Sequence, residues 1–465
     1  MFIFYDFETS SRHLIGQIIS YAFVVTDKQL NVVQNLQGKI KLNRTQCPEV
    51  DALLVNKIYV DDLQKNGQTE YAAAKDIFNF LTKMITDYGD CHLVGFNSNQ
   101  FDIGFLRTLL LRYGINPYFE GKLKNCDILH FSQYLAFYYP DKFPWVQTQS
   151  DNSSYYSFRL EELTSACGLL TEAQSHDALE DVLLTIKLVT YFEETFGESL
   201  ANFNPCQLTI NQENQTKWPL FQCKTRHFAS VGEDPQKFSY EYYAGLSLSK
   251  KSNLLISLTK YHELSHNQEH LTEADKLSCI RYVNPNKAFL IAEPMAAEQL
   301  HSWQQTQACI EDDPFFNKLK QNPGTYFEYI KKDWDIEYQI HELGFERIPE
   351  LHNITESFMN DPSQYEPILA ELLKKRQHIK DNYVIQLFNR TYLNYHPNPN
   401  PEYLKRYLAP RYVSGTMYKE EGHDNLFEKE YAYLIEKLDS VDNETDLGIL
   451  KSLLGYFEEF TELMH

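Results

Sequence analysis

The chain has 465 residues, of which 43% are hydrophobic and 23% charged, and it carries a formal net charge of −21. This length and composition predict a globular protein of two or three domains and exclude disorder as the default. No apolar run approaches the ~18 residues of a membrane span, and the N-terminal segment lacks the basic flank of a signal peptide, so we expect a cytoplasmic protein without a membrane anchor. The acidic charge argues against a general nucleic-acid coat, although it leaves room for a local basic cleft.

The cysteines are scattered, with no C-x-x-C pair and no clustering with histidine. This pattern argues against a zinc module and, in a cytoplasmic protein, favours free thiols. The eight positions are Cys47, Cys91, Cys126, Cys167, Cys206, Cys223, Cys279 and Cys309.

The first part of the chain alternates between strand and helix patterns. Residues 1 to about 60 read as strands in an antiparallel meander, and from residue 68 the apolar spacing changes to a helical period. Strands are predicted in the first ten residues and at 17–27, 31–42 and 91–98. Helices are predicted over 72–84, 101–113, 157–169 and 176–197, the last three followed or ended by glycine. These elements predict an α/β domain over residues 1–198.

The rest of the chain changes character at a polar, weakly periodic segment over residues 202–215. Short strand-like runs at 240–248, 253–260 and 287–294 predict a small β-rich domain over residues 205–300. The remaining residues, 301–465, read as a helical domain, with strong helical patterns at 366–379 and 446–464.

The first ten residues, MFIFYDFETS, place two carboxylates at the end of an apolar strand. Because strand side chains alternate between faces, Asp6 and Glu8 share one face with Phe2 and Phe4. Two carboxylates this close repel each other unless a cation neutralises them, so the pair suggests a divalent metal site. The ordinary alternative is a buried first strand whose last two acids are simply solvated.

Further polar residues stand at the ends of later elements. Asp102 follows the strand at 91–98 and opens a helix, although an acid there is also an ordinary helix-initiating residue. His176 and Asp181 face one site if Asp177 caps the helix and Glu180 is its capping-box partner, because His176 then precedes the first turn that carries Asp181. The alternative is a surface histidine beside a well-capped helix.

Together, four acids and one histidine suit a two-metal phosphodiesterase. Carboxylates are the hard ligands that Mg²⁺ and Mn²⁺ prefer, and paired ions about 4 Å apart clamp the attacking and leaving oxygens. A histidine of ordinary pKa ~6.5 accepts a proton from water near neutral pH. The set is Asp6, Glu8, Asp102, His176 and Asp181.

The motifs FYDFET, GFNSNQFD, SFRLEELT and SHDALEDV resemble the successive motifs of the DEDDh superfamily of 3′→5′ exonucleases. Within it the chain is most similar to the exonuclease I family, bacterial enzymes that degrade single-stranded DNA. The motif match covers about residues 1–190, whereas the likeness of residues 200–465 is architectural. The resemblance implies an α/β fold with a ribonuclease H-like catalytic domain built on a mixed sheet (1–198), an SH3-like nucleic-acid-binding domain (205–300) and an α-helical C-terminal domain (301–465).

The resemblance also implies roles for individual residues. Asp6, Glu8 and Asp181 would hold a catalytic Mg²⁺, with Asp6 bridging to a second ion that Asp102 supports; Mn²⁺ would substitute. His176 would be the general base. The substrate-binding residues implied are Asn97, which would support the Asp102 motif, Arg159, which would contact phosphates near the 3′ end, and Phe7 and Thr9 beside the terminal nucleotide. Core packing is the alternative for Phe7, and an exposed helix charge is the alternative for Arg159.

Two parts of the chain depart from a confident match. After Thr9 the sequence reads SSRHLIGQ rather than the usual continuation, which leaves open how the terminal base is held. The middle domain has aromatic and basic residues that would stack bases and meet phosphates, or else form an ordinary tyrosine-rich core. They are Trp218, Lys224, Arg226, Tyr240, Tyr242, Tyr243, Lys250 and Lys251.

The expected activity is therefore metal-dependent release of 5′-mononucleotides from the 3′ end of single-stranded DNA, by a monomer acting in DNA repair or recombination. An exoribonuclease or oligonucleotide-degrading enzyme is one alternative, since the site itself does not read the 2′-OH. A catalytically inactive nucleic-acid-binding scaffold is the other. The resemblance further implies the acidic C-terminal tail of single-strand-binding protein as a partner, but it does not indicate which residues bind that tail. The basic residues of the tail region that could dock an acidic peptide are Lys374, Lys375, Arg376, Lys405, Arg406 and Arg411.

Overall fold

The computed structural model describes most of the chain. The described residues are 1–150, 153–170, 177–203, 220–223, 227–229, 240–248, 253–268, 270–283, 297–326, 336, 340–413 and 426–464. Their contacts group into two compact units, one formed by residues 1–124, 174–183 and 333–465 and the other by residues 125–173 and 184–332. The C-terminal helices thus share a unit with the N-terminal strands, whereas the three predicted domain ranges followed the chain in order. Those ranges stay a prediction.

The first unit is built on a mixed five-stranded sheet in the order β3-β2-β1-β4-β5. The central strand β1 pairs antiparallel with β2, which pairs antiparallel with β3, and β1 pairs parallel with β4. The predicted meander is therefore correct. The strands are β1 (Phe2–Thr9), β2 (Ile18–Thr26), β3 (Val32–Lys39), β4 (Cys91–Gly95) and β5 (Leu123–Asp127).

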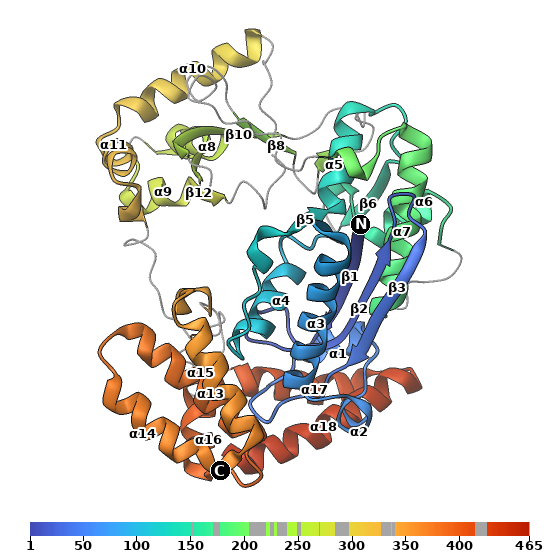
Figure 1. The fold of residues 1–465 in the computed structure, drawn as a ribbon. Coiled ribbons are helices and arrows are strands. Elements are labelled where there is room, and N and C mark those ends of the chain that lie inside the picture. The colour runs from blue at the N-terminus through green and yellow to red at the C-terminus, as the bar shows by residue number, and fades with distance from the viewer. Residues whose placement is uncertain are drawn as a thin grey trace. The chain divides into compact units, whose positions relative to one another are not determined.

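Two helices, α3 (Glu70–Tyr88) and α4 (Asp102–Leu111), cover one face of this sheet (Figure 1). Their apolar residues join the alternate residues of β1, namely Ile3, Tyr5 and Phe7, in one hydrophobic core. The face that Phe4, Asp6 and Glu8 share is the other one, as strand alternation predicts. Burial of one face by the helices therefore fixes which residues of β1 remain for a site on the opposite face.

A second core of this unit joins the C-terminal helices to two short helices that follow β3. Val50 and Leu53 of α1 and Val60 and Leu63 of α2 pack in the same cluster as Phe457 of α18. Residues 43–60, which were expected to continue as strands, thus contain helices instead, because their apolar residues recur at helical spacing. The helices are α1 (Val50–Val55), α2 (Val60–Asn66), α13 (Ile348–Asn360), α14 (Tyr365–Lys375), α15 (Ile379–Tyr395), α16 (Pro401–Leu408), α17 (Leu426–Ser440) and α18 (Glu444–Met464).

The second unit contains two small antiparallel sheets with helices. One sheet has the order β12-β11-β10-β8 and the other the order β6-β7-β9. The strands are β6 (Val146–Ser150), β7 (Ser153–Ser157), β8 (Leu220–Cys223), β9 (His227–Ala229), β10 (Tyr240–Leu248), β11 (Asn253–Ser257) and β12 (Ile280–Val283). The helices are α5 (Ile128–Tyr138), α6 (Leu160–Ala166), α8 (Leu258–Asn267), α9 (Glu273–Ser278), α10 (Ala297–Asp312) and α11 (Pro314–Gln321), and α7 (Ala178–Phe196) enters this unit at residue 184.

Several predicted boundaries shift for identifiable reasons. The strand expected over 253–260 ends at Ser257, because the Ser257 hydroxyl caps the following helix by accepting a hydrogen bond from Lys260 N at 3.1 Å. The helix expected over 157–169 spans only Leu160–Ala166, since Ser157 still belongs to β7. The strand run predicted over 287–294 lies outside the described residues. Among those that are described, no helix is long and apolar enough to cross a bilayer, and six cysteines are free thiols.

Candidate active site

The second half of β1 brings the first two predicted acids to the sheet face opposite α3 and α4. Glu8 is buried, with 7% of its surface exposed, and Asp6 is partly exposed. Across the β1–β2 pair, Asp6 lies opposite Ala22 and Glu8 opposite Ser20, so small neighbours leave room around both carboxylates. The register shifts between Glu8 and Thr9, and this bulge ends regular pairing directly after the second acid.

Asp102 is the first residue of α4 and is buried, with 3% of its surface exposed. The segment between β4 and this helix makes a tight turn in which Asn97 adopts a left-handed conformation, with φ 57°. The predicted strand over 91–98 therefore ends at Gly95, because the chain must turn to bring Asp102 to the sheet edge. An acid at this position is also favoured by the positive end of the helix dipole.

The N-terminus of α7 supplies the fourth acid. Asp177 caps the helix as predicted, since its Oδ1 accepts hydrogen bonds from Leu179 N at 3.1 Å and Glu180 N at 3.3 Å. This cap places Asp181 in the first turn, where its side chain is buried with 6% exposed. His176, the predicted general base, lies outside the described residues, and its role remains a prediction.

Asp6, Glu8 and Asp181 form one cluster, in which one carboxylate oxygen of each lies within 4.8 Å of the others. Burial, reinforced by Asp102, Glu8 and Asp181, raises the pKa of Asp6 well above its usual value. Burial likewise raises the pKa of Glu8 to about 8, with further contributions from Asp181 and Asp102. The structure thus brings the four predicted acids into one electrostatic neighbourhood in which negative charge is strongly disfavoured.

This neighbourhood fits a divalent cation. Three converging carboxylates supply the hard oxygen donors that Mg²⁺ and Mn²⁺ take, and a cation offsets both the burial and the mutual repulsion that raise the pKa values of Asp6 and Glu8. Among the residues that the structure describes, this is the one group of three or more acidic, histidine or cysteine side chains close enough to share an ion. The chemistry of the donors therefore agrees with the metal site that the sequence predicts.

The remaining predicted residues of this unit fall into different environments. Phe7 is 4% exposed and packs in the core, with its ring centroid 5.3 Å from Tyr5 and 5.6 Å from Phe23. Thr9 is buried, and its hydroxyl donates to the carbonyl of Ser11 at 2.8 Å. Asn97 is exposed on the turn before Asp102. Core packing accounts for the Phe7 side chain, and the substrate contacts of all three residues stay predictions.

Predicted binding residues outside this neighbourhood are found on other elements. Arg159 is exposed and precedes the first turn of α6. Tyr243 of β10 is buried, and its hydroxyl accepts a hydrogen bond from Arg281 at 2.7 Å, which favours the core alternative for that tyrosine. Arg406 and Arg411 line a cavity of about 430 Å³ between α14, α15 and α16. The predicted Trp218, Lys224, Arg226, Lys250 and Lys251 lie outside the described residues, as do the side chains of Tyr240 and Tyr242.

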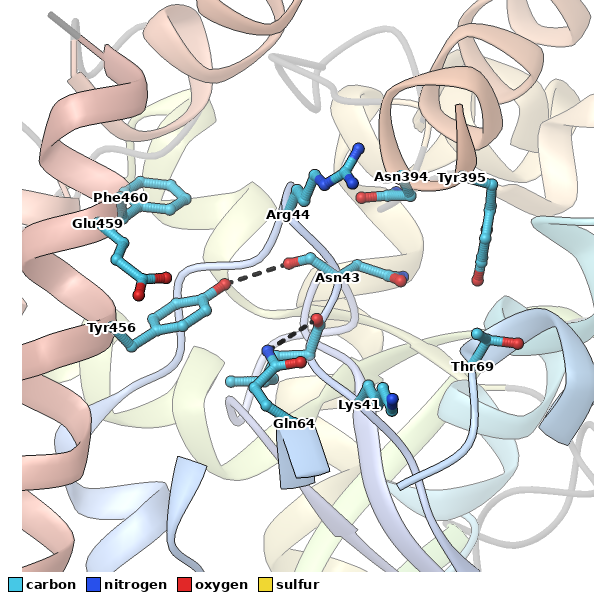
Figure 2. A pocket seen from close by; sticks show the side chains of 11 residues that line it. Lys41, Asn43, Arg44, Gln64, Thr69, Asn394, Tyr395, Tyr456, Glu459 and Phe460 are labelled. Carbon is cyan, nitrogen blue, oxygen red and sulfur yellow. Dashed lines mark hydrogen bonds between the residues drawn. The ribbon is translucent and has the colours of Figure 1, made fainter. Parts of the chain in front are cut away.

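Another cavity in the first unit, of about 350 Å³, contains none of the predicted residues (Figure 2). Its lining combines the segment around Lys41 and Arg44 with side chains of α15 and α18, among them Tyr395 and Tyr456. A large hollow and the acid cluster are therefore separate features. Metal-dependent chemistry depends on converging carboxylates rather than on cavity volume, so we place the site at the acids.

The sequence of α8 contains a pattern typical of zinc proteases, H-E-x-x-H, from His262 to His266. The two rings lie on one helix face, 4.8 Å apart between centroids. Within the described residues, no third acid, histidine or cysteine completes a ligand set there. A catalytic zinc site needs three protein ligands, so this pattern is not assigned as a metal centre.

Two sets of functional candidates escaped the sequence prediction. Asp177 was expected only as a helix cap, yet its charge also raises the pKa of Asp6 and Glu8. Its four-residue spacing from Asp181 was the available signal, because it places both acids at one helix N-terminus. A buried network around Glu70 was missed as well, because its arginine partners are 42 and 320 residues away in the sequence. The one local signal there is Arg112 itself, which directly follows the apolar residues 109–111.

No protein-family model matches the sequence, and no curated protein matches it. Solved structures do. Exonuclease I of E. coli in complex with a dA16 oligonucleotide is 19% identical, and the match covers 99% of this chain and 99% of that chain with a TM-score of 0.69. Exonuclease I of Methylocaldum szegediense is 18% identical over 99% of each chain, with a TM-score of 0.68. The zinc-bound E. coli enzyme with single-stranded DNA is also 18% identical, again over 99% of each chain and with a TM-score of 0.68. The chain therefore has an exonuclease I-like fold, and the predicted α/β fold class is confirmed.

Proposed function

We propose that the protein is a metal-dependent exonuclease that degrades single-stranded DNA from the 3′ end and releases 5′-mononucleotides. The observation that carries this proposal is the convergence of Asp6, Glu8 and Asp181 within 4.8 Å, on a fold similar to that of exonuclease I. Support for the substrate comes from the solved neighbours, which include exonuclease I bound to single-stranded oligonucleotides.

The electrostatics of the site explain why a metal would be required. Four acids would repel the phosphodiester of an approaching strand, and burial together with the charges of the neighbouring acids already raises the pKa values of Asp6 and Glu8. In the proposal, Asp6, Glu8 and Asp181 hold a catalytic Mg²⁺ or Mn²⁺, and Asp6 and Asp102 hold a second. When bound, such ions polarise the scissile phosphodiester and activate the attacking water.

The reaction is a hydrolysis. The oxygen of water forms a bond to phosphorus and the bond between phosphorus and O3′ of the preceding nucleotide breaks. An imidazole nitrogen of His176 accepts the proton of the attacking water, and the departing O3′ takes a proton from solvent. The products are a 5′-mononucleotide and a strand shortened by one residue with a free 3′-OH. Arg159 and Asn97 are proposed to help orient the strand.

The same proposal extends to partners and setting. The protein would act as a cytoplasmic monomer in DNA repair or recombination, and would bind the acidic tail of single-strand-binding protein. Arg406 and Arg411 are candidates for that contact, because they flank an apolar cavity whose lining would take the hydrophobic part of such a tail. Exchange of either arginine for glutamate should weaken binding of an acidic peptide and leave hydrolysis of naked DNA unchanged.

The direct test is removal of single metal-binding acids. Asp6→Ala and Asp181→Ala should lower hydrolysis of an oligonucleotide by about 10³-fold or more, because the residues act as one unit, while strand binding stays measurable. Asp76→Ala, at an exposed position of α3, is a matched control that should retain activity. Unchanged hydrolysis in either site variant would contradict the metal assignment. Matched DNA and RNA strands in the same assay distinguish the proposal from an exoribonuclease.

A further inference from the structure

A second cluster of buried charged side chains contains one acid and two arginines. Glu70, the first residue of α3, has no exposed surface and pairs with Arg112 at 2.7 Å and with Arg390 of α15 at 2.9 Å. Tyr113 donates its hydroxyl to the same carboxylate at 2.6 Å, and Asn43 donates its side-chain amide at 2.5 Å. Burial alone would raise the pKa of Glu70, but the guanidinium groups of Arg390 and Arg112 outweigh it and hold that pKa below its usual value.

The arginine that pairs with Glu70 also holds the loop of residues 10–17. Nη2 of Arg112 donates to the carbonyl oxygens of Ile15 and Gly16, each at 2.9 Å. The fork of a guanidinium group allows this, because its separate N–H groups point at the carboxylate and at the loop simultaneously. A lysine would offer a single ammonium at one end of a flexible stem and would serve one of the two sides at a time.

A second route links Glu70 to the end of the same loop. Asn43 donates its side-chain amide to Glu70, while its backbone N donates to Oε1 of Gln17 at 3.0 Å. Gln17 in turn closes the loop, since its carbonyl accepts from Ser10 N at 2.8 Å and its own N donates to the Ser10 hydroxyl at 2.9 Å. Figure 2 shows Asn43 on the segment between Lys41 and Arg44.

The loop directly continues the strand that carries the first two acids. The pairing of β1 with β4 covers only Phe2–Phe4, so beyond that point β2 is the strand to which β1 pairs. The bulge after Glu8 then turns the chain into the loop. The position of the loop therefore sets how the backbone of Glu8 leaves the sheet, and with it the direction of the Glu8 carboxylate.

The loop also packs along the helix that begins with Asp102. Leu14 lies against Gly104, two residues after Asp102, at a spacing so close that a Cβ at Gly104 would come within 2.8 Å of a Leu14 methyl group. Arg112 follows the last residue of the same helix, α4. The loop is thus fastened at both ends of the helix that carries Asp102, by apolar packing at one end and by hydrogen bonds at the other.

On this geometry we propose that Arg112 is a positioning residue for the active site, completed by Glu70 and by Arg390 of the C-terminal helix α15. It acts through the loop 10–17 rather than on the reacting atoms. It fixes that loop and thereby holds Glu8 in register with Asp102. This inference rests on the proposed function for its kinetic consequence, although the anchoring of the loop and the binding of a metal are measurable without it.

The test compares Arg112→Lys with a control that weakens the same unit elsewhere. Asn394→Ala is that control, because the Asn394 side chain on α15 makes two hydrogen bonds to Thr45 and one to the backbone carbonyl of Arg390, but none to a side chain of the Glu70 network. Thermal unfolding of both variants establishes how much each loses in stability. Three readouts follow: amide exchange of the loop 10–17, Mn²⁺ affinity, and kcat and KM on a single-stranded oligonucleotide.

Arg112→Lys should speed exchange of the Ser10 and Gly16 amides and weaken Mn²⁺ binding, each by about tenfold. It should lower kcat by about tenfold or more with KM within about twofold, because small misplacements of reacting groups cost up to about 10²-fold. Asn394→Ala should leave all of these near wild type. Arg390→Met should change the same three readouts in the same direction but by less, because the ion pair between Glu70 and Arg112 remains. This variant replaces Arg112→Lys in the test if Arg112→Lys does not fold.

Equal readouts in Arg112→Lys and Asn394→Ala would overturn the proposal. Faster exchange of the loop with unchanged Mn²⁺ affinity would overturn it too, because the loop would then not position the acids. A wild-type protein that does not hydrolyse DNA would refute the proposed function instead, and amide exchange and Mn²⁺ affinity would still decide the role of Arg112.

Discussion

Two buried glutamates of the same unit, Glu8 and Glu70, have opposite electrostatic surroundings. Burial and neighbouring acids raise the pKa of Glu8 to about 8, whereas Arg390 and Arg112 overcome the effect of burial and lower the pKa of Glu70. A buried carboxylate matched by guanidinium groups anchors structure, and one surrounded by carboxylates requires a cation from outside. Burial alone therefore does not distinguish a structural anchor from a metal ligand, whereas the sign of the neighbouring charge does.

The same substitution at the two positions should change stability in opposite directions. Glu70→Ala leaves two guanidinium groups buried without their acid, which should cost about 3–5 kcal/mol of stability. Glu8→Ala removes a repelled carboxylate and, without metal, should leave the melting temperature equal or higher. Thermal unfolding followed by circular dichroism in the presence of a chelator measures both. A fall in melting temperature for Glu8→Ala as large as that for Glu70→Ala would contradict the distinction between an anchoring and a metal-binding glutamate.

Divalent metal should stabilise the protein through the acid cluster. At a free concentration of about 100 times Kd, a ligand of the folded state adds about 2.7 kcal/mol. The ligands must lose their protons to bind, so the melting-temperature rise with Mn²⁺ should grow as pH increases through about 8. Asp6→Ala should remove the rise, and the exposed control Asp76→Ala should retain it. A rise of equal size in Asp6→Ala would place the metal elsewhere.

The pH dependence of the metal-free protein should reveal the raised pKa values. The pKa of Glu8 is about 8 in the folded protein and about 4.5 when unfolded, so the folded state binds this proton more tightly between those values. The proton on Glu8 therefore stabilises the folded protein most at the acid end of the range between these two pKa values. This contribution should be lost as pH rises through about 8. Glu8→Gln should flatten the fall and gain about 1 kcal/mol at the alkaline end. Parallel curves for wild type and variant would contradict the assigned shift.

The smallest stability change is expected from a surface ion pair that links the N-terminal and C-terminal parts of the same unit. Lys57 pairs with Asp446 at 2.8 Å, but half of the Lys57 side chain is exposed. Lys57→Met should cost only about 0.2–1 kcal/mol and should lose that effect in high salt. A cost comparable to that of Glu70→Ala would mean that the contrast between buried and exposed pairs does not hold in this protein.

The sequence predicted the acid cluster well because its signals are local. Strand alternation put Asp6 and Glu8 on one face, and the cap at Asp177 put Asp181 in the first turn of α7. The order of the motifs then indicated the fold. The buried network around Glu70 could not be predicted, because it depends on contacts between residues far apart in the sequence. Arg390 pairs with Glu70 from 320 positions away, and no pattern in the sequence near Arg390 indicates that it is buried. Ser257, which caps α8 and ends β11, was a local signal for this boundary, but the apolar pattern that continues past it favoured a longer strand.

In the proposed function, the converging acids serve metal-dependent hydrolysis of single strands from the 3′ end. The most direct measurement follows the products of a 5′-labelled single strand and of the matching duplex, with Mg²⁺ and with chelator. We expect a ladder of 5′-labelled fragments that shorten one nucleotide at a time on the single strand, little change in the duplex, and no hydrolysis without metal. Hydrolysis that persists in chelator, or internal cleavage without progressive shortening, would contradict it.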